Sequence, residues 1–326
     1  MNTIPPGMGD AHPSGMPSAG GDQISTERVL AESRGSAAAV AGASSGWTVD
    51  PYTGCELGCV FCPHRLDEQS FPAWRSFEAR VGVNLRAVKS FIERVSPEEL
   101  HGARVVLGNR SEPWQPAEER FRLTRSLLAA LAEARNLELR ANTRSSLVAR
   151  DIDLLLRIAS RGQVSVVFSI GCADERVTRL MEPKAPSVLR RLAAMEALAR
   201  AGLPVGLSIS PVMAGLDPEE LGLEALLTRA AHAGARFASM RWMELGPGQR
   251  ERFLSYATAA FPASASRFRR LIGRRALQGG ESRAEWESQF RRHCEALGLL
   301  DDSQSAAEAS RPAPAQLPLF AARSAH

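Results

Sequence analysis

Three cysteines, Cys55, Cys59 and Cys62, lie within eight residues with the spacing C-x3-C-x2-C. Three thiolates on one short loop can bind three corners of a [4Fe–4S] cluster, whose protein ligands are normally cysteine sulfurs. The next cysteine, Cys172, lies more than a hundred residues further along the chain. The fourth iron would therefore lack a protein ligand and could bind a substrate or a cofactor.

Two other uses of this loop need different residues. A structural zinc site usually has four Cys or His ligands, often as two CxxC-like pairs, and here only His64 is available as a fourth ligand. A thioredoxin-type redox loop needs only one CxxC pair. The three cysteines favour the cluster, with zinc as the alternative.

The elements that must position this loop follow an alternating pattern. From residue 46 onward, short strand-like runs alternate with amphipathic helical stretches, which is typical of βαβ units. We predict strands at 47–50, 105–108, 137–142, 164–170, 205–209 and 237–242, and helices at 83–95, 117–134, 151–160, 187–201 and 218–233. The fold class predicted is α/β, a partial (β/α)6 barrel of the TIM type with parallel strands. The cysteine loop follows the first strand, at the end where barrels place their sites.

The chain divides into four predicted parts. Residues 1–45 are rich in Gly, Pro, Ser and Ala and are expected to be disordered. Residues 46–246 form the barrel, and residues 247–300 form a helical extension rich in arginine. Residues 301–326 form a flexible tail.

Composition sets broad limits. The chain has 326 residues, 44% of them hydrophobic, and contains no apolar run near the roughly 20 residues needed to span a membrane. Its N-terminus does not have the order of a secretory signal, so we expect a cytoplasmic protein. The net charge is +4, and almost all of the positive charges are arginines. This excess permits nucleic-acid binding, although genomic base composition could cause the same preference for arginine.

Several stretches carry a resemblance to a known family. They are the cysteine motif with Phe61 before its last cysteine, GNRSEPWQP at 108–116, NTRS at 142–145, MEPKAP at 181–186 and SPVMAG at 210–215. Together they resemble the radical S-adenosylmethionine (SAM) superfamily, and within it the spore photoproduct lyase-like branch. The resemblance covers residues 46–246.

The resemblance implies two cofactors, a [4Fe–4S] cluster and SAM, and a flavodoxin- or ferredoxin-like electron donor. SAM would bind the open iron, and an electron from the cluster would release a 5′-deoxyadenosyl radical that abstracts hydrogen. The metal ligands would be Cys55, Cys59 and Cys62. The SAM contacts would be Phe61, Ser111, Glu112, Arg144, Ser169 and Glu182, with Arg144 on the carboxylate. Considered singly, the serines are also ordinary turn or cap residues, and Glu182 an ordinary surface carboxylate.

One position departs from the lyases. They carry a hydrogen-donating cysteine where this chain has Asn109, and asparagine cannot donate a hydrogen atom in that way. Cys172 is a tentative substitute donor, although a free cysteine is more often a small buried hydrophobic residue. Cys294 is expected to be an ordinary helix residue.

The tail carries a separate motif, made by Gln316, Leu317, Leu319 and Phe320. It resembles the pentapeptide by which bacterial polymerases and repair proteins bind the DNA sliding clamp, but five residues can also match by chance. The predicted function is a radical SAM enzyme acting on DNA or another nucleic acid, as in repair. The alternatives are radical modification of a protein or small molecule, and a non-catalytic zinc-binding adaptor that docks to the clamp.

Overall fold

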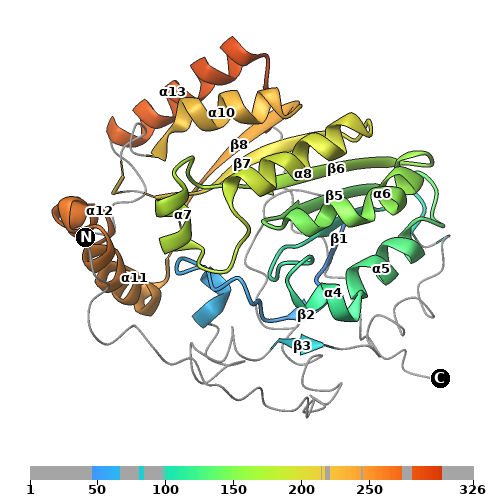
Figure 1. Ribbon diagram of the computed structural model, residues 1–326, viewed down its shortest axis with the longest axis horizontal. Helices are drawn as coiled ribbons and strands as arrows, with labels where there is room; N and C mark the ends of the chain where they lie inside the picture. The colour runs from blue at the N-terminus through green and yellow to red at the C-terminus, as the bar shows by residue number, and fades with distance from the viewer. Residues whose placement is uncertain are drawn as a thin grey trace.

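The computed structural model describes residues 46–66, 81–83, 98, 100–213, 215–216, 221–243, 245–273 and 281–302. Seven parallel strands form one sheet in the order β1-β4-β5-β6-β7-β8-β9 (Figure 1). They are β1 (Gly46–Val49), β4 (Arg104–Leu107), β5 (Glu138–Thr143), β6 (Gln163–Ser169), β7 (Val205–Val212), β8 (Phe237–Trp242) and β9 (Leu300–Asp301). The strands β1 and β9 are the two edges of this sheet and do not pair with each other, so the sheet is an open, partial barrel. The predicted α/β class is confirmed.

Helices from the βα units cover one face of the sheet (Figure 1). They are α4 (Ala117–Phe121), α5 (Leu123–Leu131), α6 (Ile152–Ala159), α7 (Glu175–Met181), α8 (Val188–Arg200) and α10 (Leu223–His232), with the 3-10 turn η2 (Ser146–Asp151) before α6. Alternate strand residues such as Leu139, Ala141 and Val166 are buried against them in one hydrophobic core.

The opposite face of the sheet is more polar. Along β5, β6 and β7 the residues between the core positions include Asn142, Ser169 and Ser208. The strand register pairs Ser169 with Ser208, and Ser208 with Ser239 on β8. All three serines are buried, and they form one row across three neighbouring strands. A polar inner face of this kind suits a site at the open side of the barrel rather than a packed interior.

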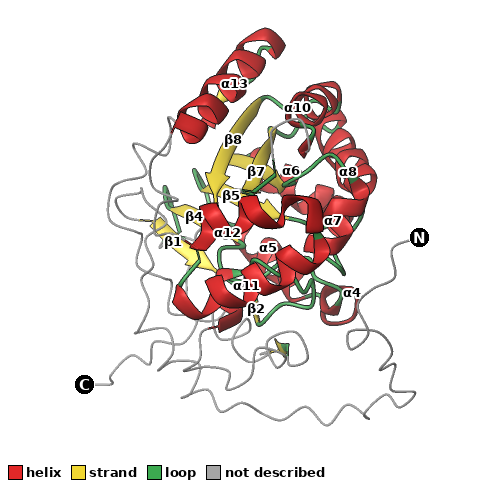
Figure 2. Cartoon of the chain, turned by 90° about the vertical axis from the view of Figure 1, so that its left-hand side faces the viewer, coloured by secondary structure: helices red, strands yellow, loops and turns green. Residues whose placement is uncertain are grey.

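The C-terminal extension is helical, as predicted. It contains α11 (Pro247–Ala260), the 3-10 turn η3 (Pro262–Ser264), α12 (Ala265–Gly273) and α13 (Glu281–Leu297). The helices α11 and α12 lie side by side (Figure 2), with Phe253 and Phe268 in T-shaped contact between them. Gly215 (φ 139°) lies against the Phe268 ring, where a Cβ would come within 2.4 Å of the ring.

Four details differ from the sequence predictions. The predicted helix at 117–134 breaks at Arg122, whose φ of 51° ends α4 and starts α5. The helix α7 was not predicted because it has only seven residues. The strand β9 was also missed, and the predicted boundary between residues 300 and 301 falls inside it. Val83 belongs to β3 (Gly82–Val83), paired with β2 (Tyr52–Thr53), and not to a helix.

Some predictions fall on residues outside the described ranges. They are the rest of the 83–95 helix apart from Val83, the disordered segment 1–45 and the tail motif at 316–320. Among the described residues, no helix is long and apolar enough to cross a membrane.

Candidate functional site

The cysteine loop lies between β2 and the 3-10 turn η1 (Pro63–Leu66), and it docks on the turn after α7. The Val60 N–H donates to the Met181 carbonyl at 3.0 Å, and the Lys184 N–H donates to the Leu57 carbonyl at 3.2 Å. These two bonds join the loop to the MEPKAP stretch, so two of the sequence motifs meet in space.

In the described part of the chain, none of the three cysteines of the loop forms a disulfide bond. Cys59 is buried, whereas Cys55 and Cys62 are half-buried. Burial raises the pKa of Cys55 to about 12 and raises the pKa of Cys59 well above its ordinary value. Burial thus favours the protonated thiols, and binding of a metal would have to displace their protons. In the part of the chain that the structure describes, no three His, Cys, Asp or Glu side chains converge on a position for a single ion.

The loop after β4 begins with three amide groups that bind one carboxylate. The backbone N–H groups of Asn109, Arg110 and Ser111 all donate to Asp50 Oδ1, at 3.0, 3.0 and 3.1 Å. The Ser111 hydroxyl donates to the Tyr52 carbonyl at 2.9 Å. Ser111 thus has a hydrogen bond to the strand β2, and its contact with SAM stays a prediction.

Glu112 is buried and organises the ends of two strands. Its Oε1 accepts from the Thr143 hydroxyl at 2.6 Å and from the Trp114 N–H at 3.1 Å. Its Oε2 accepts from the Arg144 N–H at 2.7 Å. Burial raises the pKa of Glu112, although these hydrogen bonds oppose the rise. Glu112 thus holds the main chain of Arg144 in place.

The Arg144 side chain contacts two other predicted site residues, Glu182 and Phe61. Its Nε donates to Glu182 Oε1 at 3.2 Å, and its Nη2 donates to the Ser210 carbonyl at 2.7 Å. The Arg144 Cζ lies 5.4 Å from the centroid of the Phe61 ring, within the range of a cation–π contact. The structure therefore brings Phe61, Arg144 and Glu182 together beside the cysteine loop.

A second arginine, Arg191 of α8, was missed by the sequence analysis. Its guanidinium is fully buried and pairs with Glu182 Oε2 at 2.5 Å. It also donates to the Ser169 carbonyl at 3.0 Å and to the Pro186 carbonyl at 2.7 Å. The sequence did contain a signal for a buried arginine, because Arg191 falls in the stripe of α8 that also contains the apolar residues Val188 and Met195.

The remaining candidate, Cys172, follows β6 and is 1% exposed. Its Sγ accepts from the Asp174 N–H at 3.3 Å, and it belongs to the hydrophobic core. Burial raises its pKa to about 12. This setting favours the interpretation of Cys172 as a small core residue. Cys294 is likewise buried, on α13, as expected of an ordinary helix residue.

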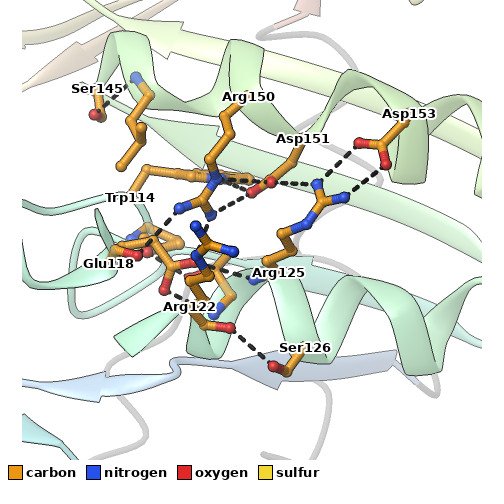
Figure 3. Close-up of polar contacts among 12 residues, drawn as sticks. Trp114, Glu118, Arg122, Arg125, Ser126, Ser145, Arg150, Asp151 and Asp153 are labelled. Atoms are coloured by element: carbon orange, nitrogen blue, oxygen red, sulfur yellow. Dashed lines mark hydrogen bonds and ion pairs between the residues drawn. The ribbon is translucent and has the colours of Figure 1, made fainter. Parts of the chain in front are cut away.

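Behind the loop after β4 lies a network of buried charges (Figure 3). Arg150 pairs with Glu118 at 2.6 Å and with Asp151 at 2.8 Å, and both carboxylates are fully buried. Asp151 also accepts from Arg125 at 2.8 Å and from the Trp114 indole at 2.9 Å. Burial opposes ionisation of Asp151, but these hydrogen bonds outweigh it and lower the pKa. The network fixes Trp114, and with it the loop that carries Glu112.

Comparison with known families agrees with this geometry. The model of the radical SAM superfamily matches residues 49–225. The uncharacterized protein Rv2578c of Mycobacterium tuberculosis is 29% identical over 230 residues, which cover 70% of this chain and 67% of that protein. The uncharacterized protein MJ0683 of Methanocaldococcus jannaschii is 25% identical over 170 residues, 52% of this chain and 61% of that protein.

Solved structures share the fold. A spore photoproduct lyase mutant superposes with a TM-score of 0.56 at 18% identity, covering 79% of this chain and 76% of that one. Another mutant of that lyase, with bound AdoMet and dinucleoside spore photoproduct, gives a TM-score of 0.54 at 19% identity over 78% and 75% of the two chains. At this identity the likeness concerns the fold.

Proposed function

The chain belongs to the radical SAM superfamily, and from this premise we propose that it is a radical SAM enzyme whose substrate is DNA or another nucleic acid. Enzymes of this family use a [4Fe–4S] cluster and SAM. When bound, these cofactors supply a 5′-deoxyadenosyl radical that abstracts hydrogen from the substrate. The protein's part is to bind them, to orient them and to exclude water.

One observation carries the proposal. Three thiols on a single loop lie beside the group formed by Phe61 and Glu182, which are buried, and Arg144, which is half-buried at the C-terminal end of β5. We assign Cys55, Cys59 and Cys62 as the cluster ligands. A four-iron cluster bonds each cysteine to a different iron, so its thiols need not converge on one point. A structural zinc ion needs four converging ligands, and the described residues contain no such group.

The charged residues beside the loop suit an amino-acid ligand such as the methionine part of SAM. Arg144 is 22% exposed and offers a guanidinium that can bind a carboxylate with two parallel hydrogen bonds. Glu182 and Glu112 hold the side chain and the main chain of Arg144, so the guanidinium is oriented before SAM arrives. Ser169 lies in the serine row next to this group, where we expect the ribose.

The helical extension supports the nucleic-acid proposal. Gln249 of α11 donates to the Pro63 carbonyl, and the Tyr256 hydroxyl of α11 donates to the Leu180 carbonyl at 2.6 Å. Through these bonds α11 lies directly against the cysteine loop and the end of α7. Exposed arginines are present on this extension, namely Arg252, Arg269, Arg270, Arg291 and Arg292. Phosphate binding by such arginines provides sequence-independent affinity for nucleic acid. Docking of the tail residues 316–320 on a sliding clamp would serve the same substrate.

The test is a product analysis with anaerobically reconstituted full-length protein, SAM and a reductant. We expect 5′-deoxyadenosine release to increase when ultraviolet-irradiated or intact DNA is added, with a new nucleotide product detected by mass spectrometry. Stimulation by peptides or small molecules but not by nucleic acid would contradict the substrate assignment. Absence of both a cluster and 5′-deoxyadenosine, with bound zinc instead, would favour the adaptor.

Replacing Arg144 by methionine is expected to weaken SAM binding about 10- to 100-fold, because a charge-assisted hydrogen bond contributes about 1.5–3 kcal/mol. Equilibrium dialysis of the reconstituted protein measures this affinity, and iron content should stay unchanged. Arg144→Lys should lose less, since the charge is kept. The control is Arg157→Met, which removes an exposed arginine of α6. Unchanged SAM affinity in Arg144→Met would refute the assignment.

A further inference from the structure

The peptide groups on both sides of Cys55 are bound by one buried side chain. Gln115, in the loop after β4, is fully buried. Its Oε1 accepts from the Glu56 N–H at 2.9 Å, and its Nε2 donates to the Gly54 carbonyl at 3.3 Å. A side-chain amide thus makes the pair of hydrogen bonds that a neighbouring strand would make to these peptide groups.

The same two loops are joined a second time in the opposite direction. Glu56 Oε2 accepts from the Ala117 N–H at 2.6 Å, at the start of α4. Each loop therefore contributes a side chain that binds the backbone of the other. Neither loop can shift without breaking buried or half-buried hydrogen bonds, and leaving such groups unpaired costs about 1–3 kcal/mol each.

Gln115 is itself fixed to the body of the barrel. The indole of the preceding residue, Trp114, donates to the fully buried Asp151. The main chain of Gln115 is held as well, because its carbonyl accepts from the Glu118 N–H at 2.8 Å. The buried charges of Figure 3 thus provide a rigid base from which the Gln115 side chain reaches the cysteine loop.

We propose that Gln115 is a positioning residue for Cys55, which fixes the direction of the Cys55 thiol toward the cluster. This inference rests on the proposed function, since it presumes that Cys55 is a cluster ligand. Residues that orient a metal ligand without touching the metal typically change metal affinity about 10- to 100-fold when they are replaced. The hydrogen bonding and exposure of the ligand sulfurs also tune the potential of an iron–sulfur cluster.

The experiment compares wild-type protein, Gln115→Met and Gln115→Glu after reconstitution with ferrous iron and sulfide. Methionine keeps the length but makes neither hydrogen bond, whereas glutamate keeps the acceptor for the Glu56 N–H. We expect iron loss to a ferrous chelator to be about 10-fold faster or more in Gln115→Met, with altered electron paramagnetic resonance of the reduced cluster. Gln115→Glu should lie between Gln115→Met and wild type.

The matched control is Gln163→Leu, which removes an exposed glutamine at the start of β6 and should behave as wild type. Circular dichroism of the four unloaded proteins establishes whether each is folded. If Gln115→Met is not folded, Gln115→Glu decides the question. If a folded Gln115 variant loses iron at the wild-type rate and its reduced cluster has the wild-type spectrum, this inference is overturned while the proposed function stands. Failure of wild-type protein to bind any cluster overturns the proposed function, and this inference with it.

Discussion

The variant Cys62→Ala is expected to lose the iron–sulfur cluster and all reductive cleavage of SAM. Cys62 is one of three candidate ligands on the loop, and its N–H donates to the Cys59 carbonyl at 3.2 Å within the turn that carries both thiols. Two cysteines would leave two irons of the cube without protein ligands. The visible absorption of the reconstituted cluster and the release of 5′-deoxyadenosine should both fall to background.

Two further cysteine variants serve as controls for this result. Cys294→Ala removes a buried thiol of α13 and should keep the cluster and SAM cleavage. Cys172→Ala should keep the cluster as well, and it decides whether Cys172 donates a hydrogen atom. If it does, SAM cleavage should persist while the substrate product changes. Retention of a full cluster by Cys62→Ala would show that the ligand assignment is wrong.

Much of the barrel could be predicted because its signals are local. Each of the six predicted strands is a short run of apolar or alternating apolar and polar residues, and all six are present in the sheet. The strand β9 gives no such signal, since it has two residues and Leu300 is 71% exposed. It forms because parallel pairing with β8 satisfies its backbone. Similarly, the left-handed backbone at Arg122 has no glycine to mark it in the sequence.

The partners of the candidate site residues could not be predicted from the sequence, and their contacts with SAM stay predictions. Glu112, Arg144 and Glu182 were expected to contact SAM separately, yet they bind one another. Gln115 escaped prediction because its side chain binds backbone groups of a distant loop, which leave no pattern in the sequence. Arg191 was missed although its place in the apolar stripe of α8 can be read from the sequence. The position of Ser208 and Ser239 beside Ser169 likewise follows from strand register alone.

The mutual binding of these groups has a functional consequence. Arg144 is held through its main chain by one buried carboxylate and through its side chain by another. A guanidinium fixed in this way loses little conformational entropy when it binds a ligand carboxylate. If Arg144 binds SAM as proposed, the carboxylates beside it would pre-organise its guanidinium. Loss of these buried ion pairs should also lower the stability of the fold.

The largest loss of stability is expected for Arg191→Met. The substitution leaves Glu182 Oε2 without its partner at 2.5 Å and removes the donors to the Ser169 and Pro186 carbonyls. Removing one member of a buried ion pair typically costs about 3–5 kcal/mol. For a domain of this size, this corresponds to a fall in melting temperature of roughly 10 °C. Thermal unfolding of the full-length protein without cofactors, followed by circular dichroism, measures it.

The neighbouring residue gives a matched control, because Arg190 is exposed on the same helix. Arg190→Met should change the free energy of unfolding by less than about 0.5 kcal/mol. The double variant Arg191→Met with Glu182→Gln should recover part of the lost stability, since it neutralises a buried carboxylate that would otherwise have only Arg144 as an ion-pair partner. A melting temperature of Arg191→Met equal to that of Arg190→Met would mean that the ion pair between Arg191 and Glu182 does not stabilise the fold. The expectation that Arg191 stabilises the contact between Glu182 and the end of β6 would then have to be rejected.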